Sequence, residues 1–268
     1  VTLVGREPHV EAVERSGLTI EGAIEAHVGP AAGTTPPAAA ALAVVTVTAG
    51  DTDAAAAALS DTALDACLSL QNGMGNEATL AQRLDCPVLA GTCTYGARLT
   101  EPGVVACTGV GEVVLGPREG GHSAPADRVG AAFTDAGVET TVADDMPRRL
   151  WEKLAVNAGI NATTALARVP NGALVDGPAR RVAERAARET AAVAREHGVD
   201  LSDDRAAEAM AQVATGTAAN HSSMLQDVAD GRQTEIAAIN GYVVAQSAGV
   251  AVPVNETLTA LVRAWESG

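Results

Sequence analysis

The pattern of apolar residues changes near Ala143, and this change constrains the fold more than any other feature. Before it, strand-like runs alternate with helix-like segments; Ala41–Thr48 is a near-continuous apolar run and Cys67–Leu70 another. This β–α rhythm predicts a parallel, doubly wound sheet. After it, no strand pattern remains and long helical patterns fill the chain. We therefore predict an α/β domain over residues 1–143 and an all-α domain over residues 144–268.

Two finer expectations follow from the same patterns. Gly103–Gly116 alternates between apolar and polar residues and carries glycines at its turns, so it predicts antiparallel strands on the flank of the sheet. Glycine and proline breakers divide the second half into helices. These helices are expected over about 148–168, 178–197, 203–229, 233–248 and 254–266.

Composition excludes several classes of protein. The net charge of −15 argues against a nucleic-acid partner, because phosphate binding needs a basic surface. No apolar run reaches the length that spans a bilayer. The four cysteines form no CxxC pair and no cluster has metal-ligand spacing, so we expect reduced thiols in a cytoplasmic protein and no metal. The oligomeric state stays open, with a homodimer as one alternative.

The basic residues are unusual, because 17 of the 18 are arginine and Lys153 is the one lysine. An excess of carboxylates with little lysine is typical of a protein from a salt-loving organism. The alternative is a GC-rich genome that encodes arginine in place of lysine. Under either explanation the one retained lysine is a candidate functional residue.

Lys153 lies in a helical pattern with two amides. Asn157 and Asn161 follow it at i+4 and i+8, which places the three side chains on one slowly drifting stripe of a helix. The adjoining residues are apolar, and buried polar groups need partners. The alternative is a solvated lysine followed by two neutral amides.

A second polar set lies near the other end of the chain. Asn220, Ser223 and Asp227 are spaced i, i+3 and i+7, which predicts one helix face, and Glu235 opens the next predicted helix. Asp227 could equally be a solvated acid. Glu235 could be a first-turn acid that the helix dipole favours.

Two further candidates follow strands. Asn72 lies in the turn Gln71–Asn76 after the second apolar strand, and ligands of open α/β sheets bind beyond the carboxyl ends of strands. An Asn-Gly pair is also an ordinary turn. Arg6 ends the first strand, where a basic residue suits the 2′-phosphate of an adenosine ribose. The alternative is a surface arginine.

Together, several stretches of the chain resemble the ketopantoate reductase family, in order and over essentially the whole length. They are VTLVGRE, LQNGMGN, WEKLAVNAGINATTAL, VPNG and SSMLQD followed by TEIAAINGYVVAQSAGVAVPVN. The resemblance implies an N-terminal Rossmann domain and an all-α C-terminal domain of the 6-phosphogluconate dehydrogenase-like type. It also implies NADPH as the cofactor.

The resemblance further implies roles for the candidate residues. Lys153 would be the general acid that protonates the ketone oxygen of the substrate. Asn157 and Asn161 would hold the substrate, Ser223 would bind its carboxylate, and Glu235 would accept its distal hydroxyl beside the cofactor. Asn72 would lie near the nicotinamide ribose and Arg6 near the 2′-phosphate. These assignments put Asn220 in the substrate set and leave the role of Asp227 open.

The activity implied is NADPH-dependent reduction of 2-dehydropantoate (ketopantoate) to pantoate, in pantothenate and coenzyme A biosynthesis. One alternative is a reductase of another branched 2-keto acid, and another is an inactive fragment without cofactor. The family opens with a strand and a GxGxxG loop about 25 residues before the position of Arg6. This chain starts at the second strand, so we expect that first strand and loop to be missing from it.

The expected loss of the loop generates a test. The GxGxxG loop supplies backbone N–H groups to the cofactor pyrophosphate at a helix N-terminus. We expect residues 1–268 alone to bind NADPH poorly, and a form extended by a strand–GxGxxG–helix segment to bind it well. Calorimetric titration of NADPH into both forms checks this. Micromolar binding by the 268-residue chain would contradict it.

Overall fold

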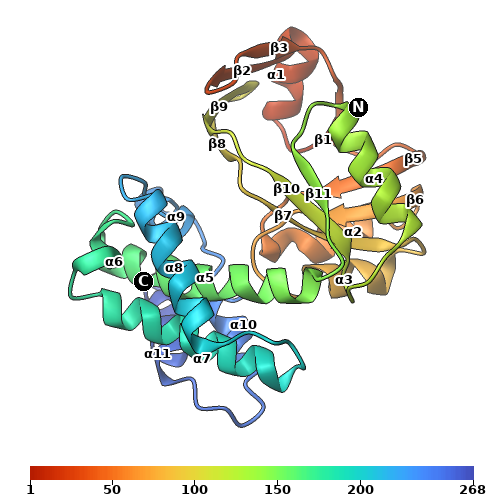
Figure 1. The fold of residues 1–268 in the computed structure, drawn as a ribbon. Coiled ribbons are helices and arrows are strands. Elements are labelled where there is room, and N and C mark those ends of the chain that lie inside the picture. Colours follow the sequence, from red (N-terminus) through yellow and green to blue (C-terminus); the bar gives the residue numbers. More distant parts are fainter. The chain divides into compact units, whose positions relative to one another are not determined.

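A computed structural model describes all residues, 1–268, and the chain divides into two compact units (Figure 1). The first unit comprises Val1–Thr46, Asp53–Leu70 and Thr79–Asp144. The second unit comprises Val47–Thr52, Gln71–Ala78 and Asp145–Gly268. Two short loops from the first half of the sequence therefore belong with the helices of the second half.

The main sheet of the first unit has five strands in the spatial order β11–β10–β7–β6–β5. Their bounds are β5 (Ala39–Val45), β6 (Ala63–Ser69), β7 (Val88–Cys93), β10 (Val113–Pro117) and β11 (Thr140–Val142). β5, β6 and β7 pair in parallel, whereas β10 runs antiparallel to β7 and parallel to β11. The predicted parallel sheet is confirmed for the strands that follow the β–α rhythm.

Helices cover both faces of this sheet, and they bury Ala66, Cys67 and Leu68 of β6 from both sides. Ala66 and Leu68 point to one face and pack in a cluster with residues of α4 (Ala124–Asp135). Cys67 points to the other face and packs with residues of α2 (Thr52–Leu59) and α3 (Asn76–Arg83). Burial from both faces explains why these three successive residues are all apolar, not only alternate ones.

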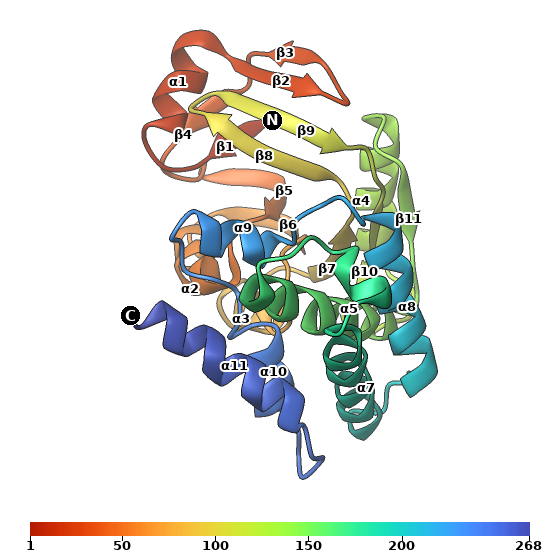
Figure 2. The same ribbon diagram turned by 90° about the vertical axis from the view of Figure 1, so that its left-hand side faces the viewer.

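The other strands of the first unit form two smaller sheets (Figure 2). The four-stranded sheet has the order β3–β2–β9–β8, and the two-stranded parallel sheet pairs β1 with β4. The bounds are β1 (Thr2–Val4), α1 (His9–Ser16), β2 (Leu18–Gly22), β3 (Ala26–Val28), β4 (Ala31–Gly33), β8 (Gly96–Glu101) and β9 (Val104–Gly109). The segment 103–116 makes antiparallel pairs as expected, but these lie in two sheets, since β9 pairs with β8 and β10 with β7.

The second unit is helical after Asp145. Its helices are α5 (Met146–Ala167), α6 (Ala173–Asp176), α7 (Arg180–Glu196), α8 (Asp203–Gly216), α9 (Ser223–Ala229), α10 (Asn240–Ala245) and α11 (Pro253–Glu266). The long helix α5 packs against α7, α8, α9 and α11. Alanine is the most frequent residue of the core, which lets helix axes approach closely in a chain that has only 2% aromatic residues.

Two expectations about these helices are wrong. The sequence predicts a single helix over 203–229, but the chain breaks between α8 and α9, where the Ser222 side chain accepts the N–H of Leu225 and caps α9. It also predicts a helix over 233–248, but only Asn240–Ala245 is regular helix. Asn220 therefore does not lie on a helix face with Ser223 and Asp227, and Glu235 does not open a regular helix. No helix of either unit combines the length and apolarity needed to cross a bilayer.

The crossing of α5 and α7 generates a stability prediction. A Cβ atom on Gly159 would lie 2.7 Å from the Ala183 carbonyl oxygen, which belongs to α7. We expect Gly159→Ala to destabilise the protein by about 1–3 kcal/mol, because overpacking outweighs the helix propensity that alanine adds. Gly216→Ala is the control, since Gly216 also lies in a helix but a Cβ atom there would meet no other atom within 4 Å. Thermal unfolding distinguishes them, and equal midpoints would contradict the close crossing.

Candidate functional site

The loops that follow β5 and β6 are joined by buried polar side chains. The Gln71 amide donates to the Val47 carbonyl (3.0 Å) and to the Thr52 hydroxyl (2.7 Å). The Thr52 hydroxyl in turn donates to Asn76 (2.9 Å), whose amide nitrogen donates to the Asn72 carbonyl (3.0 Å). Gln71, Thr52 and Asn76 are all buried. This relay fixes the backbone on which Asn72 is carried.

Both loops contact one segment of the helical unit, Thr234–Ile239. The Ala49 N–H donates to Oε1 of Glu235 (3.0 Å), and the Met74 N–H donates to the Ala238 carbonyl (3.1 Å). Gly73 has a φ of 80°, and a Cβ there would lie 2.6 Å from the Ala238 Cβ. A glycine is therefore required in this turn both for its backbone conformation and for the close approach of Ala238. The contacts bring Glu235 and the turn that carries Asn72 into one part of the second unit.

The three polar residues of α5 lie on one continuous helix, as the sequence predicts. Lys153 and Asn157 are half-buried, and Asn161 is 6% exposed. The neighbouring Glu152 faces elsewhere and pairs with Arg205, with a shortest N–O distance of 2.6 Å. An ammonium and an amide one turn apart, at the partly open part of a buried helix, form a suitable arrangement for binding a polar carbonyl compound.

Asn220 and Ser223 lie close to the start of α9 and are exposed. The Asn220 carbonyl accepts the N–H of Asn171 (2.9 Å), which ties it to the turn after α5. The Ser222 hydroxyl lies 2.7 Å from that of Thr164, a buried contact that joins α9 to α5. Ser223, the next residue, is thereby held close to α5, the helix that carries Lys153, Asn157 and Asn161.

Asp227 is engaged in a local ion pair. Its Oδ1 lies 2.9 Å from Nη2 of Arg232. Burial raises the pKa of the Asp227 carboxyl above its ordinary value, and the hydrogen bonds from Arg232 act against that rise. The pair gives Asp227 a structural partner in the turn that leads towards Glu235.

Arg6 lies in the other compact unit. It is exposed, in the loop between β1 and α1, and its carbonyl accepts the N–H groups of His9 and Val10 at the start of α1. A guanidinium at the carboxyl end of a parallel strand fits a phosphate, because it keeps its charge and offers several donors. Arg6 thus has the chemistry expected of it, separately from the residues of the second unit.

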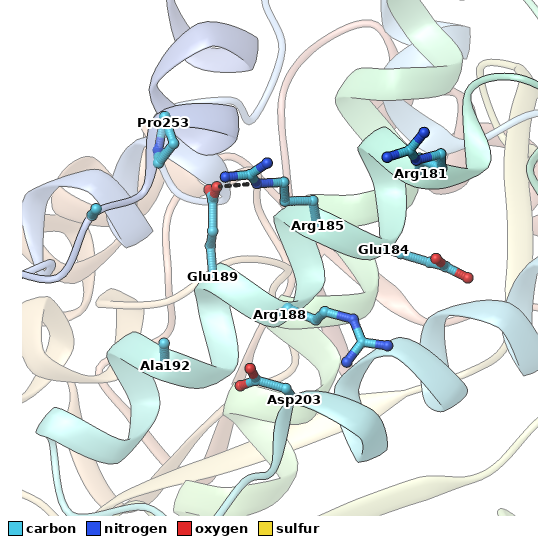
Figure 3. Close-up of a pocket in the computed structure, with 9 residues that line it drawn as sticks. Arg181, Glu184, Arg185, Arg188, Glu189, Ala192, Asp203 and Pro253 are labelled. Carbon is cyan, nitrogen blue, oxygen red and sulfur yellow. Dashed lines mark ion pairs between the residues drawn. The ribbon is translucent and has the colours of Figure 1, made fainter.

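Metal ligands and cavities add no further candidate. No group of three or more His, Cys, Asp or Glu side chains in residues 1–268 is placed to hold a metal ion. A hollow of about 420 Å³ lies along α7 (Figure 3). Its charged lining residues are Arg181, Glu184, Arg185, Arg188, Glu189 and Asp203. Equal numbers of basic and acidic groups line the hollow, so it favours neither anions nor cations.

Comparison with known proteins places the chain in a family. The models that describe ketopantoate reductase PanE/ApbA and its C-terminal part match residues 1–120 and 145–266. The chain is 45% identical to a 2-dehydropantoate 2-reductase of Halobacterium salinarum, over 98% of this chain and 90% of that relative. The chain belongs to the ketopantoate reductase family.

Other members agree in sequence and in fold. A 2-dehydropantoate 2-reductase of Archaeoglobus fulgidus is 38% identical, over 100% of this chain and 90% of the relative. The crystal structure of a PanE/ApbA family ketopantoate reductase from Ralstonia eutropha superposes with a TM-score of 0.90 at 34% identity, over 100% and 90% of the two chains. Membership of the ketopantoate reductase family confirms the predicted fold class, an α/β domain followed by an all-α domain.

Sequence reasoning missed the residues that support the candidate site. Gln71 and Asn76 lie in the stretch LQNGMGN, but the sequence assigns a role there to Asn72 alone, and Thr52 lies in none of the quoted stretches. Polar side chains directly after a buried strand are a usable signal. Ala49 contributes only its backbone N–H, which no side-chain pattern could indicate. The Thr164–Ser222 contact joins residues 58 positions apart. Such partners become visible only when the chain is folded.

The Ala49–Glu235 hydrogen bond generates a prediction. Proline at position 49 removes the donor, and Thr48 already has the extended backbone that a residue before proline prefers. We expect Ala49→Pro to lower stability by about 1.5–3 kcal/mol, the net worth of a hydrogen bond to a charged group. Ala49→Ser keeps the N–H and is the control. Thermal unfolding of both variants checks this, and equal midpoints would show that the bond contributes nothing.

Proposed function

We propose that this ketopantoate reductase family member reduces ketopantoate to pantoate with NADPH, as a cytoplasmic enzyme of pantothenate and coenzyme A biosynthesis. The observation that carries the proposal is the helix α5, which holds Lys153 and Asn157 one turn apart at half-buried positions. The family relatives named 2-dehydropantoate 2-reductase support it at up to 45% identity. We also propose residues 1–143 as the nucleotide-binding domain and 144–268 as the substrate-binding domain.

The chain's residues fit part of the cofactor. Arg6 is exposed at the end of a parallel strand and carries the donors that a 2′-phosphate requires. Asn72 would lie near the nicotinamide ribose, on the turn that the Gln71–Thr52–Asn76 relay fixes. Residues 1–268 contain no GxGxxG sequence for the pyrophosphate. When bound, NADPH supplies the hydride that the ketone carbon accepts.

The residues of the second unit would hold the substrate and manage its proton. Asn157 and Asn161 would orient the keto acid along α5, and Ser223, with Asn220, would bind its carboxylate. Lys153 would donate a proton to the ketone oxygen, where negative charge builds up during reduction. Lysine suits this step because it can release its proton, whereas arginine cannot.

Glu235 would select ketopantoate over keto acids that lack a second hydroxyl. Its Oε1 accepts the Ala49 N–H, which fixes the orientation of the carboxylate. An ionised carboxylate has two acceptor oxygens, so Oε2 is left to accept the distal hydroxyl of the substrate. A substrate without that hydroxyl would leave a half-buried acceptor unsatisfied, which is the physical basis of strong discrimination.

The role of Lys153 is tested with two substitutions, in a form of the enzyme that binds NADPH. Lys153→Met removes the charge and the proton, and Lys153→Arg keeps the charge but releases no proton. We expect kcat for ketopantoate to fall by roughly 10²–10⁴-fold in both variants, the usual worth of a positioned acid. The dissociation constant of NADPH should change much less. Steady-state kinetics and calorimetry provide the two measurements.

The control for this test is Arg205→Met. It breaks the ion pair of Arg205 on α8 with Glu152, the residue next to Lys153 on α5. Its kcat should stay near that of the unsubstituted enzyme. Near-normal turnover by Lys153→Arg would show that the lysine acts by charge alone. No reduction of ketopantoate by the unsubstituted, NADPH-binding enzyme would refute the proposed function.

A further inference from the structure

The segment that carries Glu235 is held at its first residue by the end of α11. The N–H and the hydroxyl of Thr234 both donate to Oε1 of Glu266, at 2.9 and 2.7 Å. The same hydroxyl accepts the N–H of Ile236 at 3.2 Å. Thr234 is 8% exposed, so these bonds form out of solvent. The Thr234 side chain thus bridges across Glu235, fixing the residue on either side of it.

The other end of the segment is held by the start of α11. The amide nitrogen of Asn240 donates to Asn255 Oδ1 and to the Ala158 carbonyl of α5, both at 3.0 Å. Asn255 is joined to Glu189 of α7, whose carboxylate also accepts the Val254 N–H. Asn240 and Asn255 are fully buried. The segment is therefore hydrogen-bonded to residues near both ends of α11, at Glu266 and at Asn255.

Apolar anchors hold the segment independently of Thr234. Ile236 is 1% exposed and Ile239 is fully buried, and both pack in the core of the helical unit. Removing the Thr234 hydroxyl alone would leave these anchors and the Thr234 N–H bond to Glu266 in place. The hydroxyl can therefore control the orientation of the turn without carrying the fold.

We propose that Thr234 is a positioning residue which, anchored on Glu266, fixes the orientation of the Glu235 carboxylate and so sets the preference for a hydroxyl-bearing 2-keto acid. The inference rests on the proposed role of Glu235 at the distal hydroxyl of the substrate. Thr234 itself touches neither substrate nor cofactor. It acts by holding the backbone on both sides of Glu235, whose carboxylate then meets the Ala49 N–H.

The test compares ketopantoate with the analogue that lacks its distal hydroxyl, in a form of the enzyme that binds NADPH. Thr234→Val is nearly isosteric and replaces the hydroxyl with a methyl group. We expect it to lower kcat/KM for ketopantoate by roughly fivefold to tenfold, the size of one net hydrogen bond, mainly through KM. The value for the analogue should stay unchanged. Thr234→Ser restores the hydroxyl and should restore the preference for ketopantoate.

Two further variants keep the result interpretable. Glu266→Gln retains an acceptor oxygen and should reduce the preference less than Glu266→Ala. Thr257→Val is the matched control, because Thr257 lies on α11 and its hydroxyl bonds only within that helix, to the Pro253 carbonyl. It should leave both substrates unaffected. Thermal unfolding of each variant identifies any that lose their fold. The folded variants then test whether Thr234 and Glu266 set the preference for ketopantoate.

The outcomes separate this inference from the proposed function. Glu235→Ala should abolish the preference for ketopantoate. If it does so while a folded Thr234→Val keeps the full preference, or loses activity equally on both substrates, the positioning role is wrong and the function stands. If the unsubstituted enzyme does not reduce ketopantoate, or if Glu235→Ala affects both substrates equally, the proposed role of Glu235 is wrong. The positioning role of Thr234 is then wrong as well.

Discussion

The close crossing of α5 and α7 is the constraint on which the helical unit depends. The backbone of α7 approaches Gly159 so closely that no side chain fits between them. Three alanines of α7, Ala183, Ala186 and Ala187, are fully buried in the same core. Because the core has few large side chains, it reaches normal packing density by placing the helices close together.

The helical unit also depends on hydrogen bonds between residues that are far apart in the sequence. The loops after β5 and β6 belong to the helical unit because buried amides join them to each other and because Glu235 and Ala238 accept their N–H groups. Each of these bonds satisfies a backbone or amide group away from solvent, where an unpaired group would be costly. The loops that follow two strands of the first unit thus fold as part of the second unit.

The parts of the structure that the sequence predicts are those set by local periodicity. The apolar run around Cys67 and the stripe from Lys153 to Asn161 form the expected strand and helix, because a continuous apolar run and a recurrence at i, i+4 and i+8 are both local signals. The break before Ser223 and the irregular turn at Glu235 have no such signal. Their causes are a cap and contacts with Ala49, Met74 and Glu266, and the Glu235 partner lies 186 residues away. Local patterns do not indicate partners at that separation.

The single lysine has a consequence beyond acid catalysis. Because every other basic side chain is arginine, the chain presents one side-chain primary amine, and α5 holds it at a half-buried position. Acylating or Schiff-base-forming reagents, which modify amines and leave guanidinium groups intact, therefore have one side-chain target. Amine-directed tagging of the side chains of residues 1–268 is therefore confined to α5, and a bound ligand that covers Lys153 would be detected as protection of this side chain from the reagent.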